Sequence, residues 1–196
     1  MKDLKINYIK NKNIIKKRLN EFSKNKDYFY ELCFCILTPQ SNAKKCYNAV
    51  LKLKKANFKN KNINPKEYIK EIRFYNNKSK YLIGLKEKYS MIKKELKTEN
   101  PFKLREFLVQ EIKGVGLKES SHYLRNIGYR NLAILDRHIL KNLLEYKVIN
   151  EIPKTLTKKK YYEIESRFKG FSRQINISMD ELDLLFWSIE TGEVFR

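Results

Sequence analysis

The chain has 196 residues, of which 43 are lysine or arginine and 22 are aspartate or glutamate, so its formal charge is +21. This charge makes a polyanion such as nucleic acid the expected partner, and a hydrophobic content of 42% excludes a disordered basic tail. We find no run of about 18 apolar residues and no secretory signal, so we expect no membrane association and a cytoplasmic protein.

Apolar residues recur at a spacing near 3.6 through most of the chain, which predicts α-helices. The clearest stripes are Tyr28–Ile36, Tyr47–Leu53, Tyr81–Ile92, Ile134–Leu144 and Leu182–Ile189. Asn100 before Pro101 and Ser178 before an acidic pair are helix-start signals, and Gly128 is a helix-end signal. With only 6 glycines and 4 prolines, the sequence predicts an all-α protein of nine or ten helices.

The metal-binding potential of the chain is low. Cys33, Cys35 and Cys46 lie within one segment, and without a secretory signal we expect them to be reduced thiols in the core. Three cysteines and two histidines make a transition-metal site unexpected. We expect His138 to pack or to orient a neighbour, and His122 to be exposed.

Residues 108–127 predict a helix-hairpin-helix. One apolar helix ends near Ile112, the turn Gly114-Val115-Gly116 follows, and a second amphipathic helix begins directly after it. Glycines permit a tight turn and a close approach of backbone N–H groups to a ligand, and a helix N-terminus favours anions. Together with the net charge, this pattern indicates a grip on DNA phosphates that is independent of base sequence.

Two residues near the hairpin add chemistry that DNA binding alone does not need. Lys118 lies on the first turn of the second helix, and Asp136 follows 136 − 118 = 18 residues later. A partly desolvated lysine at a cationic helix N-terminus is usable as an amine nucleophile. A carboxylate in the same cleft can accept a proton and stabilise positive charge on a sugar.

These segments together resemble the archaeal-type 8-oxoguanine DNA glycosylase/AP lyases of the helix-hairpin-helix superfamily, which also occur in some bacteria. The matching motifs span most of the chain: Leu37–Ala43, Arg73–Lys78 with Tyr81-Leu82, Lys113–Lys118 with Ser121 and Leu124–Asn126, Asp136–His138, and Leu184–Trp187 with Thr191-Gly192. The endonuclease III branch of the superfamily, with its four C-terminal cysteines, is disfavoured because none lies there.

The resemblance implies a role for each matching position. Lys118 would attack the anomeric carbon, form a Schiff base and nick the strand by β-elimination, with Asp136 as its activating and stabilising carboxylate. Phe74 and Trp187 would hold the flipped base between aromatic faces, although both lie at helical spacing and could instead belong to the core. Gln40 would fill the gap in the duplex, or it caps a helix.

The chain end is a further candidate. The family's chain usually ends in lysine near the base pocket, and this chain ends in Arg196, whose terminal carboxylate would contact the base.

The resemblance also implies a bilobal fold, with one helical lobe over residues 26–130 and a second over 1–25 plus 131–196. Lys118 and Asp136 would lie on opposite walls of the cleft between the lobes. No cofactor is expected apart from a possible Na⁺ or K⁺ ion at the hairpin.

The expected substrate is duplex DNA with 8-oxoguanine or abasic sites, bound by a monomer at the prokaryotic nucleoid. Two alternatives remain open: a glycosylase for another damaged or mismatched base, and a non-catalytic DNA-binding module.

Overall fold

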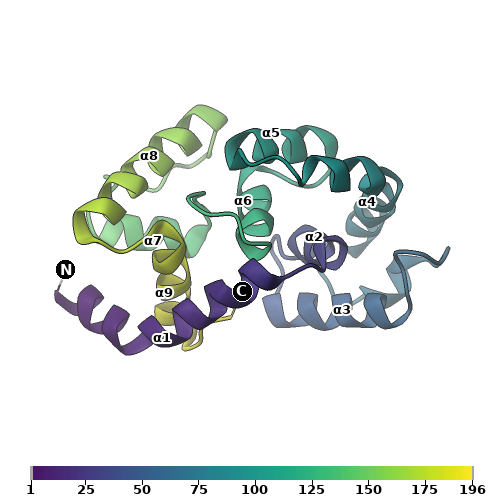
Figure 1. Ribbon diagram of the computed structural model, residues 1–196, viewed down its shortest axis with the longest axis horizontal. Helices are drawn as coiled ribbons and strands as arrows, with labels where there is room; N and C mark the ends of the chain where they lie inside the picture. Colours follow the sequence, from purple (N-terminus) through teal and green to yellow (C-terminus); the bar gives the residue numbers. More distant parts are fainter. Residues whose placement is uncertain (1, 196) are drawn as a thin grey trace. The chain divides into compact units, whose positions relative to one another are not determined.

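The computed structural model describes residues 2–195, and every regular element in that range is a helix (Figure 1). The all-α prediction is therefore confirmed. The elements are α1 (Lys2–Lys24), α2 (Tyr28–Leu37), α3 (Ala43–Lys55), the 3-10 helix η1 (Pro65–Tyr68), α4 (Tyr75–Glu95), α5 (Pro101–Glu111), α6 (Leu117–Asn126), α7 (Arg137–Glu145), α8 (Lys158–Ile175) and α9 (Met179–Thr191).

The chain divides into two compact units. The hairpin unit comprises residues 26–123, and the terminal unit comprises residues 1–25 and 124–196. The second boundary falls within α6, between residues 123 and 124, whereas the sequence-based division places it at 130. No helix among the described residues is long and apolar enough to cross a membrane.

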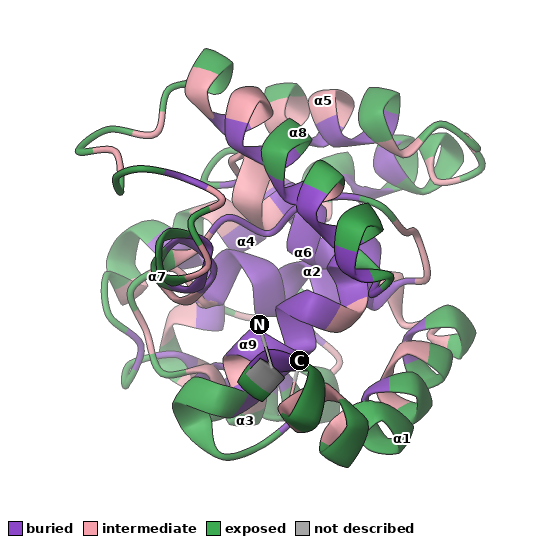
Figure 2. Ribbon diagram, turned by 90° about the vertical axis from the view of Figure 1, so that its left-hand side faces the viewer, coloured by how far each residue is buried: buried purple, intermediate pink, exposed green. Residues whose placement is uncertain are grey.

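Helix α2 forms the centre of the hairpin unit. Every one of its residues from Phe29 to Leu37 is buried (Figure 2), and α3 and α4 pack against it. The ring of Phe29 lies 4.9 Å from Tyr89 and 5.9 Å from Phe58, measured between centroids. A helix that is buried on nearly all sides is stable only when neighbours cover it, so α2 fixes the positions of the helices around it.

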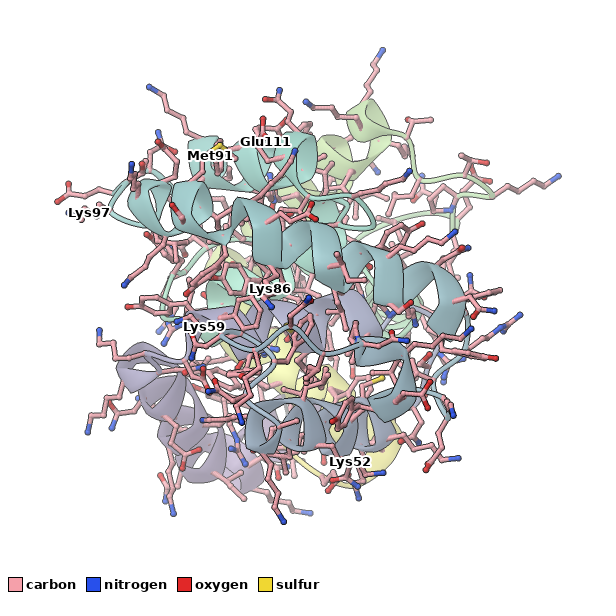
Figure 3. All side chains as sticks on the ribbon, turned by 90° about the vertical axis from the view of Figure 1, so that its right-hand side faces the viewer. Lys52, Lys59, Lys86, Met91, Lys97 and Glu111 are labelled. Atoms are coloured by element: carbon pink, nitrogen blue, oxygen red, sulfur yellow. The ribbon has the colours of Figure 1, made fainter. Side chains whose placement is uncertain are left out.

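The surface of the hairpin unit is rich in lysine. Lys52 and Lys97 are exposed, and Figure 3 shows them on the face that carries α3 and α4. Lys59 and Lys86 instead lie over aromatic rings, at 5.0 Å from Tyr89 and 5.4 Å from Phe58. Their stems therefore cover the aromatic core while their charges stay at the surface.

Helix α9 plays the central part in the terminal unit, where α1, α7 and α8 all contact it. Ser178 and Glu181 form a reciprocal capping box at its start, which confirms the predicted helix start. Inside the unit, Arg125 donates to Asp183 at 2.8 Å, and its guanidinium lies 4.9 Å from the ring centroid of Phe22. This buried pair links the end of α6 to α9 and α1.

Other helix boundaries follow the sequence signals, with one exception. Asn100 accepts hydrogen bonds from two backbone N–H groups of α5, and Gly128 lies just beyond α6 with a φ of +103°. The predicted helical stripe is wrong at its start, because α7 begins only after Asp136, and Ile134 and Leu135 lie in a buried segment that is not helical. A short buried segment has the same apolar density as a helix, so spacing alone does not separate them.

Candidate active site

The hairpin turn joins α5 to α6. Gly114 has a φ of +85°, and a Cβ atom there would overlap the ring of Tyr81. Only glycine meets both conditions without strain. Val115 is 5% exposed and anchors the turn in the core, while the Gly116 N–H donates to Oε2 of Glu119 at 3.1 Å.

Lys118 follows this turn on the first turn of α6. Its side chain is 23% exposed, and its Nζ lies 3.5 Å from Oε1 of Glu119, whose side chain is 15% exposed. The Glu119 carboxylate therefore bridges the backbone of the hairpin turn and the amine of Lys118. The sequence analysis assigned no role to Glu119; its position three residues after Gly116 is the spacing of a residue that caps its own helix.

Gln40 lies in the turn between α2 and α3, where the Ser41 N–H donates to the Thr38 carbonyl oxygen at 3.0 Å. Its φ is +53° and the residue is exposed. The cap of α2 is Thr38 and the cap of α3 is Asn42, so the alternative of Gln40 as a helix cap is wrong.

Lys78 is a residue of this site that sequence reasoning missed. It is 4% exposed and donates hydrogen bonds into the turn that carries Gln40. Its pKa is lowered to about 8, mainly by burial, and the neighbouring charge of Lys118 contributes to this shift. The signal was present in the sequence, because Lys78 occupies the same face of α4 as the buried residues Leu82 and Leu85.

Phe74 lies in the same unit, directly before α4. It has a left-handed φ of +60° and is 49% exposed, with the Arg73 guanidinium 4.8 Å from its ring centroid. A bulky residue rarely adopts this backbone conformation. The alternative of Phe74 as a core residue is wrong.

Asp136 is the N-cap of α7 in the terminal unit. Its Oδ1 accepts from the N–H groups of His138 and Ile139, both at 2.9 Å. The structure shows no protein partner for Oδ2 among residues 2–195. One carboxylate oxygen therefore holds the helix start while the other is available to a ligand.

Trp187 on α9 lies beside His138, with ring centroids 5.1 Å apart and an interplanar angle of 80°. His138 thus contacts Trp187 through its ring and the Asp136 carboxylate through its backbone N–H, which agrees with the predicted orienting or packing role. Trp187 is partly exposed rather than in the core. Ile189, expected on the packing face of this helix, is 41% exposed, so that prediction is wrong.

The remaining site predictions have mixed outcomes. Arg196 lies outside the described residues. His122 is 7% exposed, so the prediction of an exposed histidine is wrong, and all three cysteines are buried free thiols, as predicted. Among residues 2–195, no cluster of three or more histidine, cysteine, aspartate or glutamate side chains is arranged to hold a metal ion.

Comparisons with known proteins point to one family. The family model described as 8-oxoguanine DNA glycosylase matches residues 14–177. A curated relative from Fusobacterium nucleatum, named 8-oxoguanine DNA glycosylase/AP lyase, is 46% identical over 92% of this chain and 90% of its own length. A relative of the same name from Methanocaldococcus jannaschii is 40% identical over 98% of each chain.

Solved structures of 8-oxoguanine DNA glycosylases also match this chain. The crystal structure of the Methanocaldococcus jannaschii 8-oxoguanine glycosylase/lyase, in complex with a 15mer DNA containing 8-oxoguanine, matches with a TM-score of 0.89 and 37% identity, covering 100% of both chains. The 8-oxoguanine DNA glycosylase of Thermotoga maritima matches with a TM-score of 0.89 and 30% identity, over 100% of this chain and 97% of that one. The glycine turn with Lys118 directly after it, the helical fold and these matches together place the chain in the 8-oxoguanine DNA glycosylase family.

Proposed function

We propose that this protein removes 8-oxoguanine from duplex DNA and then nicks the strand, with Lys118 as the nucleophile. The position of Lys118 is the observation that supports its assignment as the nucleophile. It is a partly buried amine on the first turn of α6, directly after the glycine turn. Backbone N–H groups at such a turn bind phosphate, so an amine beside them lies next to the sugar-phosphate chain of a bound strand.

The reaction then follows from ordinary amine chemistry. The Lys118 amine attacks the anomeric carbon of the damaged nucleotide, the bond to the base breaks, and the base leaves with the electron pair. The bond between the anomeric carbon and the ring oxygen then breaks, which opens the sugar ring and gives a Schiff base. Removal of a proton from the adjacent sugar carbon expels the 3′ phosphate, which nicks the strand on that side.

Asp136 serves as the carboxylate of this reaction. Positive charge develops on the sugar as the base departs, and a nearby carboxylate stabilises it. Oδ1 of Asp136 is committed to the start of α7, so we assign this electrostatic role to Oδ2. A carboxylate can also act as the general base of such a reaction.

The base and the duplex are held by other predicted residues. Phe74, which is 49% exposed, and Trp187, which is partly exposed, are the residues that stack on the extruded base in this proposal. Gln40, exposed and with a left-handed backbone conformation, fills the gap in the duplex. Backbone groups of the hairpin turn grip a phosphate, with or without a bound Na⁺ or K⁺ ion, and the protein acts as a monomer at the nucleoid without an organic cofactor.

Borohydride trapping tests this function directly. The wild-type protein, incubated with a duplex containing 8-oxoguanine and sodium borohydride, should give a covalent protein–DNA adduct because borohydride reduces the Schiff base. Lys118→Gln should give no adduct and should still bind the duplex. The matched control is Lys113→Gln, which removes an exposed lysine of the same hairpin and should still be trapped. An adduct with Lys118→Gln would identify a different amine as the nucleophile.

A further inference from the structure

We propose that Lys78 is a positioning residue for base extrusion, because its ammonium group holds the turn at residues 37–41 in the conformation that presents Gln40 to the DNA. The proposal rests on the gap-filling role proposed for Gln40. Lys78 itself is 4% exposed and does not reach the substrate.

The contacts of Lys78 converge on this one turn. Its Nζ donates to the carbonyl oxygens of Leu37 and Pro39, both at 2.7 Å, and to Oγ of Ser41 at 3.0 Å. An ammonium group has three N–H donors, and all three are used here. The Leu37 oxygen lies at the C-terminal end of α2, where a helix has unpaired carbonyl groups and favours a positive charge.

The turn needs such a support because its backbone is strained. Pro39 occupies the second position and Gln40 the third, where a positive φ normally requires glycine. Strained residues persist only when the surrounding structure holds them, and they are concentrated at functional sites. The exposed side chain of Gln40 makes no hydrogen bond to residues 2–195, so the constraint comes from the backbone contacts around it.

Burying a charged lysine costs free energy unless hydrogen bonds compensate for the lost hydration. The pKa of Lys78 is lowered to about 8, mainly by burial, and four neighbouring groups contribute to this net shift. Cys46 on α3 and Glu119 on α6 raise the pKa, while Lys118 on α6 and Arg73 before α4 lower it. A neutral amine has only two N–H donors for the three acceptors, so the turn loses one contact above about pH 8.

The first experiment is a double-mutant cycle with Lys78→Met and Gln40→Gly. Gln40→Gly removes the side chain and relieves the strained backbone. Each single variant should lower the single-turnover rate on 8-oxoguanine duplex about tenfold, a loss equivalent to about 1.4 kcal/mol. The double variant should be no slower than either, because both remove the same function.

The outcomes distinguish a failure of the role proposed for Lys78 from a failure of the gap-filling role proposed for Gln40. A normal rate for Lys78→Met, or losses that multiply in the double variant, would overturn the role of Lys78. A normal rate for Gln40→Gly would instead remove the gap-filling role of Gln40. Lys80→Met is the matched control, because it removes the same charge from an exposed position on α4 and should leave the rate unchanged.

A second measurement uses the pH dependence of the wild-type protein. In the wild-type protein, the ratio of the rate on 8-oxoguanine duplex to the rate on a preformed abasic site should fall as the pH rises through about 8. Groups that act on both substrates cancel in this ratio. Lys78→Met should show a flat ratio, and 2-aminopurine beside the lesion should report weaker unstacking at high pH in the wild type alone. A flat wild-type ratio would contradict the proposal.

Discussion

At the scale of single residues, one atom separates the helix-capping role of Asp136 from the catalytic role proposed for it. Oδ1 caps α7 through two backbone N–H groups, and Oδ2 has no protein partner among residues 2–195. Asparagine caps helices about as well as aspartate does, but it cannot stabilise positive charge on a sugar. The two functions should therefore respond differently to two substitutions.

We predict that Asp136→Asn keeps the melting temperature of the wild type and loses most of the base-release activity. Asp136→Ala should lose the activity and also about 1 kcal/mol of unfolding free energy, since the cap is removed. Thermal melts and single-turnover assays on both variants test this. An active Asp136→Asn would show that the carboxylate charge is not needed.

Trp187 is the second residue with a distinct expected effect. It contacts His138 edge to face and is partly exposed, so its indole is not fully buried in the core. Base stacking is worth about 1–3 kcal/mol, so Trp187→Ala should slow 8-oxoguanine release roughly 5-fold to 150-fold. Nicking at a preformed abasic site should suffer far less, because no base remains to be held.

Single-turnover rates on the two substrates provide the comparison, with Trp187→Phe as a control that keeps an aromatic face. Equal losses on both substrates, or a large fall in melting temperature, would place Trp187 in the core.

At the scale of elements, sequence reasoning worked where a signal is local. The caps at Asn100 and Ser178 and the glycine turn before α6 were all predictable, because each depends on residues within a few positions. The left-handed backbone of Gln40 was not, because the contacts that sustain it come from α4, distant in the sequence.

The same limit explains two wrong predictions. Burial of His122 depends on neighbours such as Phe34, whose ring centroid lies 5.7 Å away. Ile134 and Leu135 are buried without being helical, so these apolar residues resemble the start of a helix stripe. Both outcomes depend on tertiary packing, which the spacing of apolar residues along the chain does not reveal.

The hairpin turn is the element whose geometry is most directly testable. Gly114→Ala introduces a side chain at a φ of +85° and against the ring of Tyr81. We expect a loss of about 1–3 kcal/mol of unfolding free energy together with weaker duplex binding. Gly84→Ala is the control, because this glycine lies inside α4 with nothing near its Cβ position.

Gly84→Ala should stabilise the protein by about 0.5–1 kcal/mol and leave binding unchanged. Denaturant melts and a binding titration measure both quantities. Unaltered binding by a folded Gly114→Ala variant would remove the hairpin turn from the DNA interface.

At the scale of the whole molecule, the charge of +21 makes a strong prediction about salt. Each phosphate contact releases counterions and contributes a slope of about −0.9 to a plot of log K against log salt concentration. About four to seven contacts are typical for a protein of this size, so the slope should lie between roughly −4 and −6. A titration by fluorescence anisotropy measures it, and a slope near zero would mean that the basic surface does not face DNA.

The buried thiols have a consequence for the conditions in which the protein works. Oxidants attack thiolates far faster than thiols. Burial raises the pKa of Cys46 to about 11 and that of Cys33 well above its usual value. Both therefore stay protonated and shielded at neutral pH. A protein that repairs oxidised guanine must work while oxidants are present, and these cysteines are chemically protected from the same stress that creates its substrate.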